Sequence, residues 1–190
     1  MKTSKRNIKF LTGAEVRQLI NSIPVDDLAG KGFRDRALLE VLFSTGLRIS
    51  EALALKRVDL DKNPTETLEL DIIGKGGWQR TIYVSPVALH AVLTYFEDRW
   101  DKSEMAFPMG VRAVQIMIKR RAKQAGIDKF ISPHVMRHSF ATNLLNKGVN
   151  IYYVQEFMGH RALSSTSCYL HVINSTLKKI HKDLYETKET

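Results

Sequence analysis

The chain contains very little cysteine, since Cys168 is the only one among 190 residues. A single thiol excludes an intrachain disulfide framework and is typical of proteins from a reducing compartment. Long apolar runs are also missing: no stretch of about 18 apolar residues occurs, and no apolar N-terminal segment of signal-peptide type. We therefore expect a cytoplasmic protein that has no membrane partner.

Acidic residues are scarce relative to basic ones. The sequence has 20 Asp and Glu against 29 Lys and Arg, which gives a formal net charge of +9 at pH 7. This excess favours a polyanionic partner such as nucleic acid, although charge alone fits a basic protein that binds nothing acidic equally well. With 44% hydrophobic and 26% charged residues, the composition is that of a globular protein with one sizeable core.

Apolar residues at helical spacing dominate the remaining pattern. Six or more segments show it, and the most apolar of them covers residues 32–44. Two alternating segments, 67–73 and 79–84, are joined by the turn Gly74-Lys75-Gly76-Gly77 and predict a β-hairpin. We expect a single, mainly α domain with a small antiparallel β-sheet, an α+β fold, and leave a third strand open.

The stretch 134–169 collects side chains that suit attack on a phosphodiester: His134, Arg137, His160 and Tyr169. A spacing of three places His134 and Arg137 on one face of a helix, and Gly159 ends the next helix directly before His160. Arginine offers a planar fork of donors to two phosphate oxygens, and tyrosine can be a covalent nucleophile. A histidine can share the phenol proton near neutral pH.

Arg48 directly follows the most apolar helix, in the segment T45-G-L-R48-I-S-E51. Because Leu47 and Ile49 flank it, we expect its side chain to be partly buried and therefore paired, with Glu51 as the nearby candidate. Taken alone, this segment is explained most simply by a buried Arg–Glu pair that joins two helices. Lys75 alone is likewise explained most simply as a solvated turn lysine.

Residues 111–125 predict a helix with several basic side chains and no acidic one: Arg112, Lys119, Arg120, Arg121 and Lys123. Because the usual i, i+4 partners are absent, phosphate contact is a better interpretation than a merely solvated face. The basic arm 1–9 either touches a DNA backbone or is a solvated tail.

Several boxes in the same order together resemble the tyrosine recombinase (phage integrase) family, in particular its Xer-type and short fimbrial-switch-type members. They are T45-G-L-R48-I-S-E51-A-L, G74-K75-G76-G-W-Q-R80, H134-V-M-R137-H-S-F-A-T, M158-G159-H160 and Y169-L-H-V. The resemblance implies a catalytic domain over residues 10–172, preceded by the arm 1–9 and followed by a C-terminal amphipathic helix and tail, 173–190. It also implies site-specific DNA recombination (integration, excision, inversion or resolution).

The resemblance implies a role for each matching residue at the phosphate. Tyr169 attacks the scissile phosphate and forms a 3′-phosphotyrosyl link. Arg48 and Arg137 hold the non-bridging oxygens, and His160 donates a further hydrogen bond to the same phosphate.

The resemblance assigns proton transfer to other residues of these boxes. The resemblance implies that Lys75 protonates the leaving 5′-oxygen, that His134 assists proton movement at the tyrosine, and that Glu51 orients the site. It implies no metal or other cofactor. The expected partner is a double-stranded DNA recombination site, bound by a homo-tetramer in synapsis and by a monomer when free, with a partner recombinase or DNA-bending protein as a further candidate.

Other interpretations remain open on the sequence. A type IB topoisomerase-like relaxing enzyme shares the chemistry, but the boxes resemble recombinases more closely. A non-cutting DNA-binding regulator derived from a recombinase is a further alternative, against which all catalytic positions are filled. His134 and His138 have zinc-ligand spacing, but Val135 stands where a metalloprotease needs glutamate. The short N-terminus fits either an excised catalytic domain or a short recombinase. Among rival tyrosines, we expect at least one of Tyr152 and Tyr153 to pack into the core.

Overall fold

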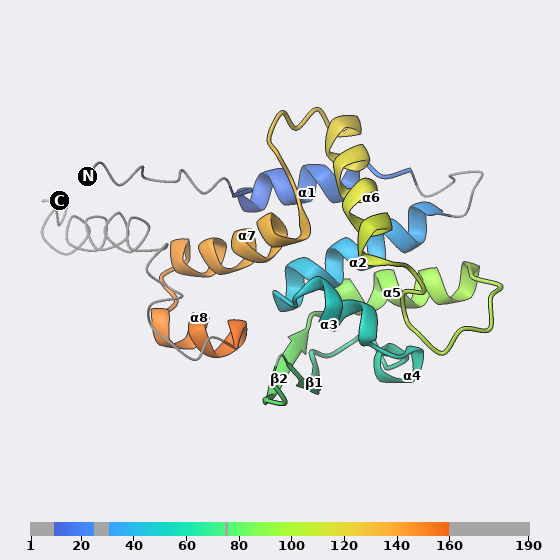
Figure 1. Cartoon of the computed structure of the whole chain (residues 1–190), viewed down its shortest axis with the longest axis horizontal. Coiled ribbons are helices and arrows are strands. Elements are labelled where there is room, and N and C mark those ends of the chain that lie inside the picture. Colours follow the sequence, from blue (N-terminus) through green and yellow to red (C-terminus); the bar gives the residue numbers. More distant parts are fainter. Residues whose placement is uncertain (1–9, 25–30, 75, 160–190) are drawn as a thin grey trace, which may run out of the picture.

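The computed structural model describes residues 10–24, 31–74 and 76–159, so the expectations for segments 1–9 and 173–190 lie outside the described residues. In chain order the elements are α1 (Gly13–Asn21), α2 (Lys31–Thr45), α3 (Ile49–Ala54), α4 (Arg57–Leu60), β1 (Leu68–Ile73), β2 (Gln79–Val84), α5 (Pro86–Asp98), α6 (Val111–Gln124), α7 (Pro133–Asn146) and α8 (Ile151–Met158). The predicted mainly α fold with a small antiparallel sheet is confirmed (Figure 1).

Helix α2 is the centre of the fold. It packs against α5 and α7 and also contacts α1, α3 and β2. Figure 1 shows it between α1 and α7 on one side and α5 on the other. A helix enclosed in this way needs apolar residues on more than one face, and the adjacent Leu38 and Leu39 are indeed both fully buried. The start of α3 therefore lies against the best-packed part of the molecule.

Local capping signals fix where the helices begin. The Thr12 side chain accepts a hydrogen bond from the Glu15 backbone while the Glu15 carboxylate accepts one from the Thr12 backbone, and together they form a capping box. Ser132 caps α7 by accepting from the Val135 backbone, and Asn150 caps α8 in the same way. These caps set the orientation of the two helices that carry the C-terminal boxes.

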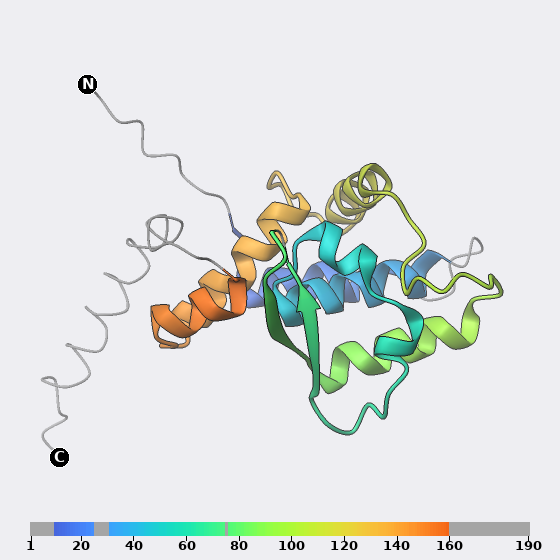
Figure 2. The same cartoon turned by 60° about the horizontal axis from the view of Figure 1, so that its bottom comes forward.

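Strands β1 and β2 form the predicted hairpin, with Leu68 opposite Val84 and Ile73 opposite Gln79. Its turn closes through a hydrogen bond of 2.7 Å from the Gly74 backbone to the Trp78 carbonyl. Figure 2 shows the hairpin beside α8, in agreement with the contacts between α8 and β2. Within the described ranges no third strand joins this sheet, and no helix there is long and apolar enough to cross a membrane.

Candidate active site

Arg137 joins three parts of the fold. It lies in the first half of α7, and its side chain is only 6% exposed. Its Nη1 donates to the Gly46 carbonyl at 2.6 Å, and its Nη2 donates to the Met158 carbonyl at the end of α8. The guanidinium is therefore held by backbone from the α2–α3 turn and from α8.

Gly46 has a conformation and surroundings that suit only glycine. Its φ is +63°, in the left-handed region, and a Cβ at this position would lie 2.3 Å from the ring of Phe140. Phe140 is on α7, one turn after Arg137. The close approach of the backbone to this helix is what brings the Gly46 carbonyl within reach of the Arg137 guanidinium.

Arg48 pairs with Glu51 as the sequence predicted. The Glu51 carboxylate accepts from the Arg48 backbone at 2.8 Å and from Arg48 Nη1 at 3.0 Å. The Arg48 side chain stays 30% exposed, whereas that of Glu51 is 7% exposed. The first turn of α3 thus fixes one edge of the Arg48 guanidinium and leaves the remainder accessible.

Arg80 is a member of this cluster that sequence reasoning missed. From β2 it donates to Glu51 through two nitrogens, Nη1 to Oε1 at 3.2 Å and Nη2 to Oε2 at 2.7 Å. A signal was present, because Arg80 shares the inward face of its strand with the buried Ile82 and Val84. An arginine on a buried face needs a carboxylate partner.

Glu51 keeps its negative charge in this cluster. Burial of its carboxyl opposes ionisation, but hydrogen bonds from Arg80 and Arg48, together with the Arg80 charge, lower the pKa of Glu51 to about 2. Arg137 Nη1 lies 4.0 Å from the same carboxylate. Three arginines around one carboxylate leave an excess of two positive charges, which suits an anion such as a phosphodiester.

A cavity of about 340 Å³ opens beside these arginines. It is lined by Arg48, Ile49, Ser50, Gln115, Ser132, Pro133, His134 and Arg137. The structure therefore brings together Arg48 from one box of the sequence and His134 and Arg137 from another. Ser50, Ser132 and Gln115 add polar groups that sequence reasoning did not single out, because no motif separates them from ordinary surface residues.

The remaining expected catalytic residues, Lys75, His160 and Tyr169, lie outside the described residues. Their neighbours Gly74 and Gly159 are described, and both approach Arg80 closely: a Cβ at Gly74 would lie 2.8 Å from Arg80 Nη1. A Cβ at Gly159 would lie 3.0 Å from Arg80 Cδ. The chain therefore passes the Arg48–Glu51–Arg80 cluster directly before two of these three residues.

Comparison with known proteins identifies the family. A model of the phage integrase family matches residues 9–175. The chain belongs to the phage integrase family. Tyrosine recombinase XerD of Corynebacterium glutamicum is 38% identical over 178 residues, covering 87% of this chain and 58% of the relative, and tyrosine recombinase XerC of Bacillus pumilus is 35% identical, covering 95% and 62%. The chain thus spans about three fifths of the length of these curated relatives.

Solved structures of phage integrase family members share the fold. The XerA recombinase superposes with a TM-score of 0.76 at 25% identity, over 95% of this chain and 66% of that one. The XerH site-specific recombinase bound to palindromic difH substrate gives 0.78 at 24% identity, over 97% and 56%. The catalytic domain of bacteriophage HP1 integrase gives 0.63 at 19% identity over 95% of this chain and 96% of that domain. The described fold is therefore that of a phage integrase catalytic domain.

The basic helix α6 has two kinds of basic residue. Arg112, Lys119 and Lys123 are exposed, and the Arg120 side chain is 48% exposed. Arg121 differs from the sequence-based expectation of a DNA-backbone contact, because its side chain is 3% exposed and its Nη2 lies 2.7 Å from buried Asp35 on α2. The acidic partner that α6 itself lacks is therefore supplied by α2, and the pair with Asp35 is buried.

The rival tyrosines also differ from expectation in one respect. Tyr152 and Tyr153 are 65% and 67% exposed, so the prediction that at least one packs into the core is wrong. The buried stripe of α8 runs through Val154 and Met158, which leaves both tyrosines on the outer side. Tyr95 is buried as expected of a structural residue.

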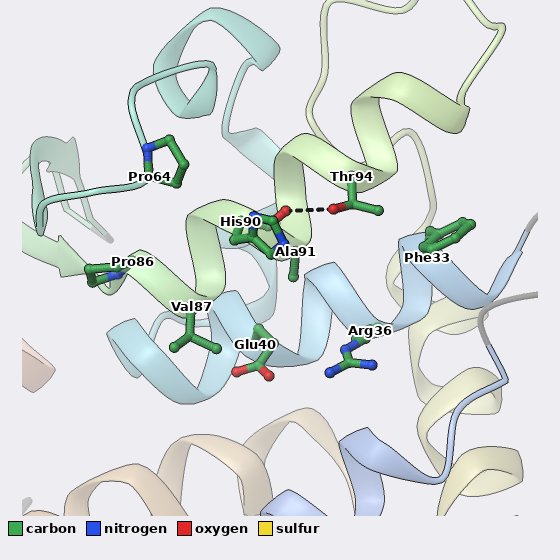
Figure 3. A pocket seen from close by; sticks show the side chains of 9 residues that line it. All are labelled: Phe33, Arg36, Glu40, Pro64, Pro86, Val87, His90, Ala91 and Thr94. Carbon is green, nitrogen blue, oxygen red and sulfur yellow. Dashed lines mark hydrogen bonds between the residues drawn. The ribbon is translucent and has the colours of Figure 1, made fainter.

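A larger pocket lies elsewhere in this phage integrase domain. Its volume is about 540 Å³, and Figure 3 shows it between α2 and α5, with Pro64 from the loop that precedes β1. Burial raises the pKa of its Glu40 carboxyl, while the charge of Arg36 acts in the opposite direction. None of the residues expected from the sequence to act in catalysis lines this pocket, so size alone does not locate the site.

Proposed function

We propose that this chain is the catalytic domain of a site-specific DNA recombinase, which cleaves and rejoins double-stranded DNA through a 3′-phosphotyrosyl link. The observation that carries the proposal is the pocket shared by Arg48, His134 and Arg137 in a chain of the phage integrase family. The relatives named tyrosine recombinases XerD and XerC support the same activity.

The proposed chemistry assigns the phosphate to the arginines. Arg48 and Arg137 hold the two non-bridging oxygens of the scissile phosphate, and the excess positive charge of the Glu51 cluster stabilises the charge that spreads over the oxygens during transfer. Because Arg137 is fixed by two backbone carbonyls and Arg48 by Glu51, both guanidiniums are oriented before DNA binds. His160 adds a hydrogen bond to the same phosphate.

Bond exchange in this proposal is balanced by two proton transfers. The Tyr169 oxygen forms a bond to phosphorus while the bond to the 5′-oxygen breaks. His134 assists removal of the phenol proton, and Lys75 donates a proton to the leaving 5′-oxygen. A 5′-hydroxyl of another strand then reverses these steps and releases Tyr169, so that no external energy source is needed.

The proposed partners follow from the same chemistry. Exchange between two duplexes needs four cleavage sites, which we assign to a homo-tetramer on synapsed DNA formed from free monomers. A partner recombinase or a DNA-bending protein is a further proposed partner. Because its substrate is DNA, we place the activity in the cytoplasm.

Covalent capture on DNA tests the proposal. A pool of nicked suicide duplexes, randomised around the nick, is incubated with the chain and resolved on a denaturing gel. We expect a protease-sensitive DNA–protein band from the wild type, undiminished by EDTA, and no band from Tyr169→Phe, which still binds DNA. An equal band from Tyr169→Phe, or loss with EDTA that zinc restores, would contradict the mechanism.

A further inference from the structure

We propose that Arg80 is a positioning residue for catalysis, which holds Glu51 and through it Arg48 in the geometry that receives the scissile phosphate. The inference rests on the proposed function and adds to it a role for Arg80 of β2, a residue to which the family resemblance assigned none.

The first observation is the fork between Arg80 and Glu51. Both terminal nitrogens of Arg80 reach the two carboxylate oxygens, at 3.2 and 2.7 Å, and both side chains are 7% exposed. A buried two-point contact of this kind fixes the plane of the carboxylate as well as its position. The orientation of Glu51 is therefore set from the hairpin, not only from α3.

The second observation is that Glu51 also accepts two hydrogen bonds from Arg48. Oε2 accepts from the Arg48 backbone and Oε1 accepts from Arg48 Nη1. Arg48 is the partly exposed arginine that lines the 340 Å³ cavity. Any rotation of the carboxylate consequently changes the direction of the guanidinium that faces the phosphate.

The third observation concerns the arginine that Glu51 does not approach. Arg137 Nη1 lies 4.0 Å from Glu51 Oε2, beyond hydrogen-bond distance. Without Arg80, a buried carboxylate would turn toward the remaining cations and neutralise charge that the phosphate needs. Arg80, which is not among the residues that line the cavity, thus keeps the carboxylate paired.

The backbone at two glycines lies so close to the Arg80 side chain that a Cβ there would crowd it. A Cβ at Gly74 would meet its Nη1 at 2.8 Å, and a Cβ at Gly159 would meet its Nε and Nη1 at 3.1 Å. Gly74 precedes Lys75, and Gly159 precedes His160. Arg80 therefore packs directly against the chain that leads into both residues.

Within the described ranges, the two terminal nitrogens of Arg80 are paired and its Nε is not. Its Nε is buried, and among the described residues it has no acceptor. Buried donors without a partner are rare in proteins because they lose their bond to water. The two terminal nitrogens are satisfied at the cost of Nε, which agrees with a guanidinium oriented by Glu51.

The decisive variant is Arg80→Lys, which keeps the charge and loses the fork. Single-turnover adduct formation is measured at saturating suicide substrate, together with DNA affinity and melting temperature. We expect the adduct rate to fall about tenfold or more, with DNA affinity and melting temperature close to wild type, because orientation rather than binding is lost. In the double variant with Glu51→Gln we expect no further fall beyond that of the slower single variant.

The chain offers a matched control in Arg99. It is also buried and forked, with Nε donating to Asp101 at 3.0 Å. It differs from Arg80 in its partner: Asp101 also accepts from the Ser103 backbone, whereas Glu51 also accepts from Arg48, which lines the cavity. Arg99→Lys should leave the adduct rate unchanged. In addition, a 5′-phosphorothiolate substrate, whose leaving group needs no proton, should rescue Lys75→Ala and not Arg80→Lys.

The outcomes separate this proposal from the function on which it rests. A wild-type chain that forms no adduct overturns the proposed function, and this inference with it. A wild-type adduct together with an unchanged rate in Arg80→Lys overturns the inference alone. The inference is also overturned if the fold-reductions in adduct rate of Arg80→Lys and Glu51→Gln multiply in the double variant. Fully multiplied effects would mean that the two residues act through different groups.

Discussion

Glu51 determines how three arginines can share one corner of the fold. Arg48 and Arg80 donate to it directly, and Arg137 lies at its edge. Without an ionised carboxylate these guanidiniums would repel each other in a partly dry environment, where charges interact more strongly than in water. The same carboxylate leaves the cluster cationic, so it stabilises the fold and preserves the attraction for phosphate.

The pH dependence of stability tests the role of Glu51 at the residue scale. Because its folded pKa is lowered to about 2, its contribution is complete above the unfolded value and is lost as pH falls through the folded one. Urea unfolding of Glu51→Gln should show a deficit on the order of 2 kcal/mol at about pH 6, narrowing toward about pH 3. The exposed Glu66→Gln serves as control, and a deficit independent of pH would contradict the assignment.

Single residues were predictable where their neighbours along the chain decide their environment. The Arg48–Glu51 pair follows from flanking apolar residues and a spacing of three, and it was predicted. The Asp35–Arg121 pair joins residues 86 positions apart, so the absence of acidic residues near Arg121 gave the wrong interpretation. Arg80 was missed for a similar reason, since its partner lies 29 positions away.

The turn between α2 and α3 is the element on which the position of Arg137 depends. Gly46→Ala would place a methyl group 2.3 Å from Phe140 in addition to adopting an unfavourable backbone conformation. We expect a loss of about 2–5 kcal/mol in unfolding free energy, from about 1–2 for the conformation and about 1–3 for overpacking. Adduct formation should fall further than stability alone explains, because the Gly46 carbonyl moves away from the guanidinium.

Gly126 provides the matched control for that turn. Its φ is +68°, but nothing lies within 4 Å of the position its Cβ would take. Gly126→Ala should therefore lower the unfolding free energy by about 1–2 kcal/mol, the cost of the left-handed conformation alone, and leave cleavage unchanged. Equal losses in the two variants, measured by urea unfolding, would mean that the contact with Phe140 carries no energy.

Among the helices and strands, those features were predictable that depend on residues close together in the sequence. The hairpin follows from alternating residues on either side of a glycine-rich turn, and it was predicted. The caps of α1, α7 and α8 are local in the same sense, because Thr, Ser and Asn side chains accept from backbone N–H groups two or three residues later. The environment of Tyr152 and Tyr153 was not predicted, because both lie on an amphipathic helix whose buried stripe is set by packing against α7. The short helix α4 also lacked a periodic signal, since four residues complete little more than one turn.

For the whole molecule, net charge and its distribution are expected to govern the proposed DNA binding. The chain carries +9 overall, and the exposed Lys119 and Lys123 of α6 add to the charge near Gln115, which lines the cavity. Binding through phosphates releases counterions, so affinity should fall steeply with salt. The salt dependence therefore reports how many cations contact the backbone.

Charge variants of α6 separate surface contacts from structural pairs. Replacing Lys119 and Lys123 by Gln should reduce the slope of log affinity against log salt by about 1 for each contacting residue. Arg121→Gln should leave the slope unchanged and lower the unfolding free energy by about 3 kcal/mol, because it breaks a buried pair with Asp35. This is the lower end of the range for a buried pair, since Arg34 and Arg120 still contact Asp35. A change of slope in Arg121→Gln would place this side chain back among the DNA contacts.

The most direct test of the whole account is chemical identification of the amino acid that carries the DNA. After covalent capture, nuclease trimming and trypsin digestion, mass spectrometry locates the nucleotide. The account predicts a nucleotide on peptide 162–178, whose only tyrosine is Tyr169, attached through a 3′-phosphate. A nucleotide on peptide 148–161, which contains the exposed Tyr152 and Tyr153, or on a serine would contradict it.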